Sequence, residues 1–192
     1  MLSILVNTSI RNLRSYMPAV LSFDQAVTLP IVWITAHYCV VQAQLHSVQD
    51  TLVHAASGGV GLVSVEWAMR AHANTHATAG GVAKHALLRS CNVLRLCSIS
   101  SSRNAIACAE LLSRQLRGRR IHSVVSALSN DFVSLSFAVL GSHGMLVETE
   151  PCGACLPASS RVVHPASHRF LPRDWQEWHL ELWSLIRGAA IG

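Results

Sequence analysis

The sequence predicts an α/β fold in which a doubly wound parallel sheet lies between two layers of helices. Short apolar runs alternate with helical patterns of about ten residues between positions 50 and 148, as in successive βαβ units. Hydrophobic residues make up 51% of the 192 residues and charged residues only 13%, which suits strands that are buried on both faces. A glycine-rich turn at residues 58–61 separates the first expected strand from the helix that follows it.

The expected elements follow one another with short connections. Ser22 and Gln25 are placed to cap a short helix within residues 1–28, which otherwise read as irregular. Residues 31–44, after Pro30, read as an apolar, buried helix. The later expected strands are residues 50–56, 75–79, 94–97, 122–126 and 145–148. The helices expected between them are residues 62–71, 83–90, 104–116 and 131–140, with a turn at 141–144 before the last strand.

Composition and charge exclude several classes of protein. High hydrophobicity with few charges excludes an intrinsically disordered chain, and 11 glycines and 6 prolines without a regular period exclude a fibrous one. The net charge of +5 permits an anionic partner, but the basic residues form no long tract, so nucleic-acid binding is not predicted. Six cysteines are too few for a secreted disulfide scaffold of this length, and we expect them to be buried free thiols.

The sequence gives no sign of a leader peptide or of a membrane span. Residues 1–14 lack the basic opening and the apolar stretch of a signal peptide. The most apolar window, residues 29–43, is too short to cross a bilayer and contains His37 and Gln42. We therefore expect a soluble, cytoplasmic protein that makes no membrane contact.

The string Ala56-Ser57-Gly58-Gly59-Val60-Gly61 has the spacing of the dinucleotide fingerprint G-x-G-x-x-G, with alanine in the first position. The turn must bring backbone N–H groups against a pyrophosphate, and a side chain at Gly58 would keep the phosphate away. A glycine at position 61 lets the helix pack closely on the strand. Because the string follows an expected strand and opens an expected helix, it predicts a Rossmann-like dinucleotide site. The alternative is a glycine-rich turn that binds no ligand.

The charges after the second strand favour NADPH over NADH. NAD-selective sites place a carboxylate there for the ribose 2′-hydroxyl, yet no Asp or Glu occurs between Glu66 and Glu110. Lys84, His85 and Arg89 offer cations to a 2′-phosphate instead. A lysine on a solvated helix face is the alternative interpretation of Lys84.

At these residues the chain resembles the medium-chain dehydrogenase/reductase superfamily. Within it, the chain is most similar to the zinc-free enoyl reductase domains of type I polyketide and fatty acid synthases, with quinone oxidoreductases as relatives. The order and spacing of the matching strings hold from about residue 23 to residue 148. These strings are residues 29–38, 53–61, 77–80, Lys84 with 87–89, 101–103, 130–132 and 144–148.

The resemblance implies hydride transfer from NADPH to the β-carbon of an α,β-unsaturated acyl thioester carried on an acyl carrier protein, then protonation at the α-carbon. Lys84 matches a lysine that relatives use to bind the 2′-phosphate, and this is the role we favour. Some synthase domains use the same lysine in proton donation, so Lys84 is also the candidate catalytic residue. No metal is implied. The implied cofactor-binding residues are Ala56, Ser57, Gly58, Gly59, Val60, Gly61, Thr78, Gly80, Lys84, Arg103, Ser126 and Leu128.

The chain also departs from the family pattern. Asn104 and Ile106 stand where an aspartate near Arg103 would act as proton donor. The family's Asn-Ser-Leu string near the nicotinamide is Ser126-Ala127-Leu128, and the lysine of its Glu-Ile-Gly-Lys string is replaced by Pro151.

From these departures we expect a truncated, divergent or misread coding sequence, and low or no activity of this chain alone. The expected domains are a remnant of the substrate-side domain at residues 1–28, a Rossmann domain at 29–150 and a Pro/Trp-rich tail at 151–192.

Other constellations are weaker. Two cysteines and two histidines have a spacing that suits zinc poorly, so we expect a plain loop; they are Cys152, Cys155, His164 and His168. In the tail, one helical face carries apolar side chains, which favours a docked or surface-lying helix; they are Trp175, Trp178, Leu182, Leu185 and Ile186. We expect the ring of His54 to form hydrogen bonds with backbone groups and Tyr38 to lie in the core.

A catalytically silent Rossmann module and a quinone or enone reductase remain alternative functions. A homodimer is a candidate assembly.

Overall fold

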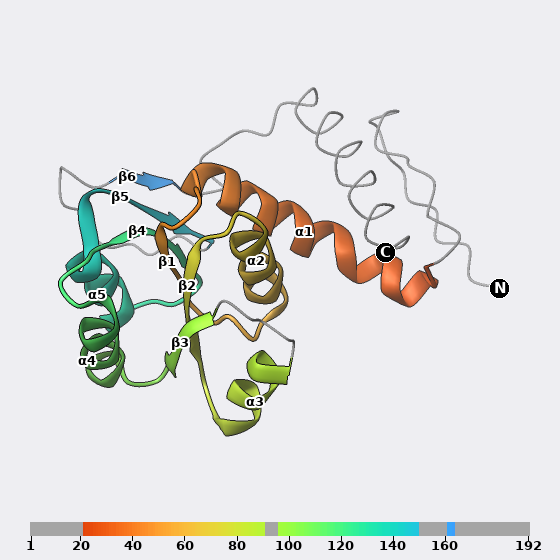
Figure 1. Cartoon of the computed structure of the whole chain (residues 1–192). Helices are drawn as coiled ribbons and strands as arrows, with labels where there is room; N and C mark the ends of the chain where they lie inside the picture. Colours follow the sequence, from red (N-terminus) through yellow and green to blue (C-terminus); the bar gives the residue numbers. More distant parts are fainter. Residues whose placement is uncertain (1–20, 91–95, 150–160, 164–192) are drawn as a thin grey trace. The chain divides into compact units, whose positions relative to one another are not determined.

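The computed structural model describes residues 21–90, 96–149 and 161–163 (Figure 1). The chain divides into two compact units, one formed by Thr35–His168 and the other by Met1–Ile34 with Arg169–Gly192. The candidate site and its surroundings all belong to the first unit.

Helices and strands alternate along the described residues. The helices are α1 (Phe23–Ala43), α2 (Gly59–Arg70), α3 (Val82–Ser90), α4 (Ala105–Leu116) and α5 (Asp131–Val139). The strands are β1 (Asp50–Val53), β2 (Asn74–Ala79), β3 (Leu96–Ser101), β4 (Ile121–Ser126), β5 (Leu140–Glu148) and β6 (Arg161–Val163).

The strands form one six-stranded sheet in the order β3-β2-β1-β4-β5-β6, and every pair is parallel. The chain order reverses between β1 and β4, because β2 and β3 lie on one side of β1 while β4, β5 and β6 lie on the other. This arrangement confirms the predicted α/β, doubly wound, Rossmann-like sheet. Ligands of such sheets bind at the carboxyl ends of the strands, beside the point of reversal.

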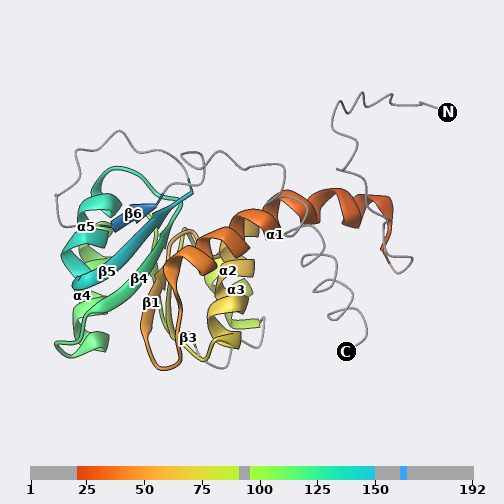
Figure 2. The same ribbon diagram turned by 90° about the horizontal axis from the view of Figure 1, so that it is seen from above.

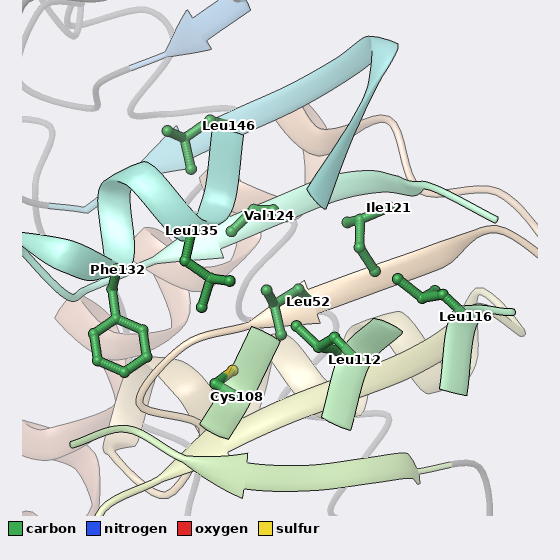
Figure 3. Close-up of a cluster of buried hydrophobic side chains, with 9 residues drawn as sticks. All are labelled: Leu52, Cys108, Leu112, Leu116, Ile121, Val124, Phe132, Leu135 and Leu146. Atoms are coloured by element: carbon green, nitrogen blue, oxygen red, sulfur yellow. The ribbon is translucent and has the colours of Figure 1, made fainter. Parts of the chain in front are cut away.

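The two faces of the sheet are covered by different helices, which gives the predicted three layers (Figures 1 and 2). On one face, α4 and α5 pack through a cluster of buried side chains that Figure 3 shows: Leu52, Cys108, Leu112, Leu116, Ile121, Val124, Phe132, Leu135 and Leu146. On the other face, α2 and α3 pack on β1 and β2 through Val53, Ala56, Val65, Ala77, Ala79 and Leu88. The C-terminal part of α1 packs there on β4 and β5, through Cys39 and Ala43.

The first helix starts at the predicted cap but is longer than predicted. The Ser22 hydroxyl accepts a hydrogen bond from the Gln25 N–H (3.2 Å), and the Ser22 N–H donates to Gln25 Oε1 (2.9 Å). This reciprocal capping box starts a single helix, α1, at Phe23. The expectation of a separate helix that begins after Pro30 was therefore wrong, because one continuous helix passes through that residue.

Two later strands also differ from the prediction. Strand β3 covers Leu96–Ser101 rather than residues 94–97. Residues 141–144 were expected to form a turn before the last strand, but they lie inside β5. Leu140 pairs with Ile121 and Met145 pairs with Ser123, so the additional residues of β5 are accommodated as an irregularity of the register. The sheet also gains β6, which follows the last strand that the sequence pattern indicated.

The cysteine prediction is confirmed in part. Cys39 and Cys108 are free and buried, and burial raises the pKa of the Cys39 thiol to about 12, so this thiol stays protonated at neutral pH. Cys97 forms no disulfide and is exposed on β3, the edge strand of the sheet. Cys91, Cys152 and Cys155, and the tail tryptophans, lie outside the described residues.

Within the ranges that the structure describes, no helix is long and apolar enough to cross a membrane. The same residues contain no group of three or more His, Cys, Asp or Glu side chains that could hold a metal ion. All four members of the Cys/His constellation considered for zinc lie outside those ranges.

Candidate functional site

The glycine-rich turn connects the carboxyl end of β1 to the first turn of α2. Ala55 adopts a left-handed backbone conformation with φ of 49°. The N–H of Gly58 donates to the carbonyl oxygen of Ala55 (2.9 Å), and α2 begins at the next residue, Gly59. The chain therefore reverses direction within a few residues at the edge of the sheet where ligands of this fold class bind.

Gly61 allows α2 to lie against the turn. A Cβ at this position would lie 2.5 Å from the carbonyl oxygen of Ala55 and 2.6 Å from the Cα of Ala56. Both neighbours are backbone atoms, so a larger residue would move the helix. This is the close approach of helix and strand that the fingerprint predicts for its last glycine.

Gly58 is the N-cap residue of α2, and its surroundings leave room for a side chain. Its backbone is extended, with φ of −82°, and a Cβ there would make only an ordinary contact of 3.4 Å with Ala55 O. Gly58 and Gly59 are exposed, and the first N–H groups of α2 have no intrahelical acceptor. The start of α2 thus presents amides and the positive end of a helix dipole, the features that bind anionic groups.

Cationic side chains follow the second strand. Lys84 is exposed in the first turn of α3. The Arg103 side chain lies beside Gly80, where a Cβ would come within 3.5 Å of its Nε. His85 donates from Nε2 to the carbonyl oxygen of Ala79 (3.0 Å), so its ring is held against the backbone. Lys84 and Arg103 are therefore the cations at this edge that could receive a phosphate.

Thr78 and His54 lie beneath the turn and face the interior. The Thr78 side chain is fully buried and contacts His54 Nδ1 (3.2 Å) and the N–H of Ala55 (3.1 Å). His54 is also buried, and its Nε2 contacts Ser136 Oγ (3.0 Å). Backbone partners were expected for the His54 ring, and that expectation was wrong, because hydroxyl groups of β2 and α5 occupy both ring nitrogens. Burial lowers the pKa of His54 to about 4, so the ring is neutral at pH 7.

Ser126 is the last residue of β4 and Leu128 follows it, beside the carboxyl end of β5. Ser126 is buried, and its hydroxyl donates to the Leu128 carbonyl (3.2 Å) while it accepts from the Leu128 N–H (3.3 Å). The Ser126 backbone carbonyl accepts two hydrogen bonds from Thr149. Glu148, paired with Ser126 in the register, is a buried carboxyl group at this edge that the sequence reasoning did not assign to the site.

Asn104 has a structural role where the family pattern has a carboxylate. Its side chain accepts from the N–H of Ala107 (3.0 Å) and caps α4. Ile106 is exposed and apolar. Neither side chain can donate a proton as a carboxylic acid. The Tyr38 side chain is buried, as expected for a core residue.

A buried carboxylate, Asp50, lies at the opposite, amino-terminal end of β1 and pairs with the half-exposed Arg119. Asp50 Oδ2 lies 2.9 Å from Arg119 Nη1, and its Oδ1 lies 3.4 Å from His76 Nε2. His76 Nδ1 contacts Ser98 Oγ (2.8 Å). Local sequence does not indicate this cluster, because its members come from four separate segments that only the sheet brings together.

No protein-family model matches the chain. A highly reducing polyketide synthase of Gibberella zeae is 33% identical over 133 residues, which are 69% of this chain and 6% of the synthase. A hybrid PKS-NRPS synthetase of Aspergillus violaceofuscus is 34% identical over 127 residues, which are 66% of this chain and 3% of the synthetase. The chain thus spans only a small part of the curated relatives that it matches.

Solved structures with a similar fold include the CurK enoyl reductase, with a TM-score of 0.81 and 26% identity over 92% of this chain and 55% of that one. The nucleotide-binding subdomain of the enoylreductase domain of PpsC from Mycobacterium tuberculosis has a TM-score of 0.73 and 20% identity, and the match covers 83% of this chain and 94% of the subdomain. A quinone oxidoreductase of Pseudomonas syringae has a TM-score of 0.76 and 22% identity over 92% of this chain and 57% of that one. The matches to the PpsC subdomain and to the quinone oxidoreductase, at 20% and 22% identity, show only that the fold is the same.

Proposed function

The chain is a partial homologue of reducing polyketide synthases, with the fold of enoyl reductases of the medium-chain dehydrogenase/reductase superfamily, and we propose that it is the NADPH-binding part of an enoyl reductase domain. The observation that carries the proposal is the turn between β1 and α2. Its exposed glycine, Gly58, has an extended backbone, and a Cβ there would meet only the Ala55 carbonyl oxygen at 3.4 Å, so the protein itself leaves the approach to the first amides of α2 open to a pyrophosphate.

The pyrophosphate of the cofactor would bind residues 56–61. Anionic oxygens would accept hydrogen bonds from the first amides of α2, where the helix dipole is favourable. Gly58 and Gly59 are exposed there, so backbone atoms can approach the phosphates closely. Ser126 and Leu128 belong to the nicotinamide side of the same edge in this proposal.

The 2′-phosphate would lie between Lys84 and Arg103. Lys84 extends from the first turn of α3, and Arg103 lies beside Gly80 at the end of β2. Because no carboxylate occurs between Glu66 and Glu110, the two cations would attract a phosphate there and no carboxylate of this segment would repel it. We therefore propose NADPH, rather than NADH, as the cofactor.

Bound NADPH would supply a hydride to the β-carbon of an α,β-unsaturated acyl thioester on an acyl carrier protein. This chain would hold and orient the cofactor through the residues above. Since Asn104 caps α4, a different group must protonate the α-carbon. Lys84 is the remaining candidate that the sequence indicates, although its phosphate role is the one we favour. In this proposal the Rossmann domain covers residues 29–150. The protein forms a homodimer and is located in the cytoplasm.

Two alternatives have an observation of their own. The capping role of Asn104 favours a catalytically silent Rossmann module, since the proton donor of the family pattern is absent at that position. The fold that the chain shares with a quinone oxidoreductase is also compatible with reduction of a quinone or another enone. Both alternatives retain the dinucleotide site, and they differ from the main proposal in the reaction that follows binding.

The test is calorimetric titration of the full chain with NADPH and with NADH. We expect saturable binding of NADPH and weaker binding of NADH. The absence of saturable binding for both nucleotides would remove the proposal. Assays with crotonyl thioester and with a quinone, each with NADPH, then separate the reactions. Binding without either reaction would agree with the silent module and equally with the low or absent activity expected of this chain alone.

A further inference from the structure

We propose that His54 and Thr78 are positioning residues that hold Ala55 in its left-handed conformation and thereby aim the glycine turn at its ligand. Both side chains are buried and neither faces solvent. Thr78 would then act on the cofactor through the backbone of the turn rather than by contact. The inference rests on the proposed function for the identity of the ligand, whereas the hydrogen bonds that carry it are independent of that function.

The hydrogen bonds around His54 allow a single assignment of protons. The Ser136 hydroxyl donates its hydrogen to the Phe132 carbonyl (2.6 Å), so toward His54 it can only accept. His54 Nε2, at 3.0 Å from Ser136 Oγ, must therefore carry the ring hydrogen. In the neutral ring Nδ1 is then an acceptor, and the Thr78 hydroxyl donates to it across 3.2 Å.

This assignment leaves the lone pairs of Thr78 Oγ1 for the turn. One of them accepts the N–H of Ala55 (3.1 Å). The carbonyl of the same threonine accepts the N–H of Ala56 (2.9 Å). Thr78 thus fixes two successive amides of the turn, and Ala55 lies between them with φ of 49°. An alanine rarely adopts this conformation unless its surroundings impose it, so the hydrogen bonds supply what the residue type does not.

His54 also connects the two halves of the sheet. Through Thr78 it contacts β2, and through Ser136 it contacts α5, which follows β4. Its backbone N–H donates to the carbonyl of Val125 on β4 (2.9 Å), and its ring packs edge-on against Phe132 at 5.4 Å. The chain order reverses between β1 and β4, so the buried imidazole lies beneath the point where a dinucleotide would cross the sheet.

The first experiment compares threonine variants of the full chain. Thr78→Val removes the hydroxyl and leaves the Ala55 N–H unpaired, while Thr78→Ser retains it. Thr51→Val is the matched control, since the Thr51 hydroxyl is equally buried and bonds Ser123 within the sheet, away from the turn. We expect Thr78→Val to weaken NADPH binding roughly tenfold and to speed amide exchange in residues 55–58, and we expect the other two variants to change neither.

The second experiment tests the histidine. His54→Asn places an amide oxygen near the position of Nδ1, where it can accept from Thr78, whereas His54→Leu has no acceptor. We expect NADPH affinity and slow exchange at Ala55 to be retained in His54→Asn and lost in His54→Leu. Nitrogen NMR of the wild type should show hydrogen on Nε2 and none on Nδ1.

The outcomes separate this inference from the proposed function. If the wild type binds no dinucleotide, the proposed function fails, and amide exchange in the Thr78 variants still decides the positioning role. If Thr78→Val binds NADPH like the wild type and exchanges no faster at residues 55–58, the positioning role is overturned. A ring hydrogen on Nδ1 would overturn it as well.

Discussion

The carbonyl oxygen of Ala55 lies only 2.5 Å from the point where a side chain on Gly61 would begin. One residue belongs to the turn after β1 and the other to the first turn of α2, so this distance sets how closely the helix follows the strand. The amides at the start of α2 owe their position to this contact.

Gly61→Ala should therefore destabilise the protein. The new methyl group would meet backbone atoms of Ala55 and Ala56, which cannot rotate away, and overpacking of this kind costs about 1–3 kcal/mol. The measurement is urea denaturation followed by circular dichroism. Gly81→Ala is the control, because a Cβ there meets nothing within 4 Å and should leave the free energy of unfolding unchanged. Equal stability of the two variants would contradict the contact.

Lys84→Met should reduce the affinity for NADPH and leave that for NADH unchanged. The variant would lose one charge-assisted contact with the 2′-phosphate, and we expect the dissociation constant for NADPH to rise about tenfold. Titration calorimetry with both nucleotides measures the ratio. Arg114→Met, an exposed arginine on α4, removes the same charge elsewhere and should preserve the preference. A parallel loss for both nucleotides would contradict the phosphate role.

Arg119→Met should destabilise the protein although Arg119 is half exposed. Its guanidinium lies 2.9 Å from the Asp50 carboxylate, which is 1% exposed and would keep only the long His76 contact. The loss of one partner of a buried charge is costly, and allowing for the exposure of the arginine we expect about 1–3 kcal/mol. Arg70→Met breaks an exposed pair with Glu66 and should cost less than about 0.5 kcal/mol in the same denaturation experiment.

Stability should fall as the pH is lowered from 7 to 5. Burial lowers the pKa of His54 to about 4, below its ordinary value of 6.5, so the unfolded chain binds the proton first. This contribution is present above pH 6.5 and is lost as the pH falls toward 4, with a loss of about 2 kcal/mol by pH 5. Burial also lowers the pKa of His76, so this histidine adds to the loss of stability at low pH. Urea denaturation at a series of pH values should show a shallower decline for His54→Asn, and an unchanged slope would contradict the assignment.

Asn104→Ala should cost about 1 kcal/mol of stability, because the side-chain oxygen that accepts from the Ala107 N–H is lost. Asn104→Asp retains an acceptor at the helix start and should keep the wild-type midpoint of thermal unfolding. If both variants unfold at the wild-type temperature, the cap contributes nothing to stability.

The sequence by itself determined the order of helices and strands and the place of the glycine turn. Both depend on local properties, namely the alternation of apolar runs and the backbone freedom of glycine. The spacing of Ser22 and Gln25 also predicted a helix cap there, and the structure shows it, although the continuation of that helix through Pro30 was not predicted. The length of β5 could not be predicted, because its irregular pairing with β4 depends on how residues 140–148 meet a distant strand.

Only the tertiary structure decided which polar side chains face the site and which support it. Thr78 looked like a cofactor residue from its place in a matching string, and His54 looked like a strand-end histidine satisfied by backbone groups. The parallel sheet brings them together with Ser136, 82 positions away from His54 in the chain. The same is true of Asp50, His76 and Arg119. Local sequence reports how a residue shapes its own backbone, whereas hydrogen bonds between distant segments exist only once the strands have paired.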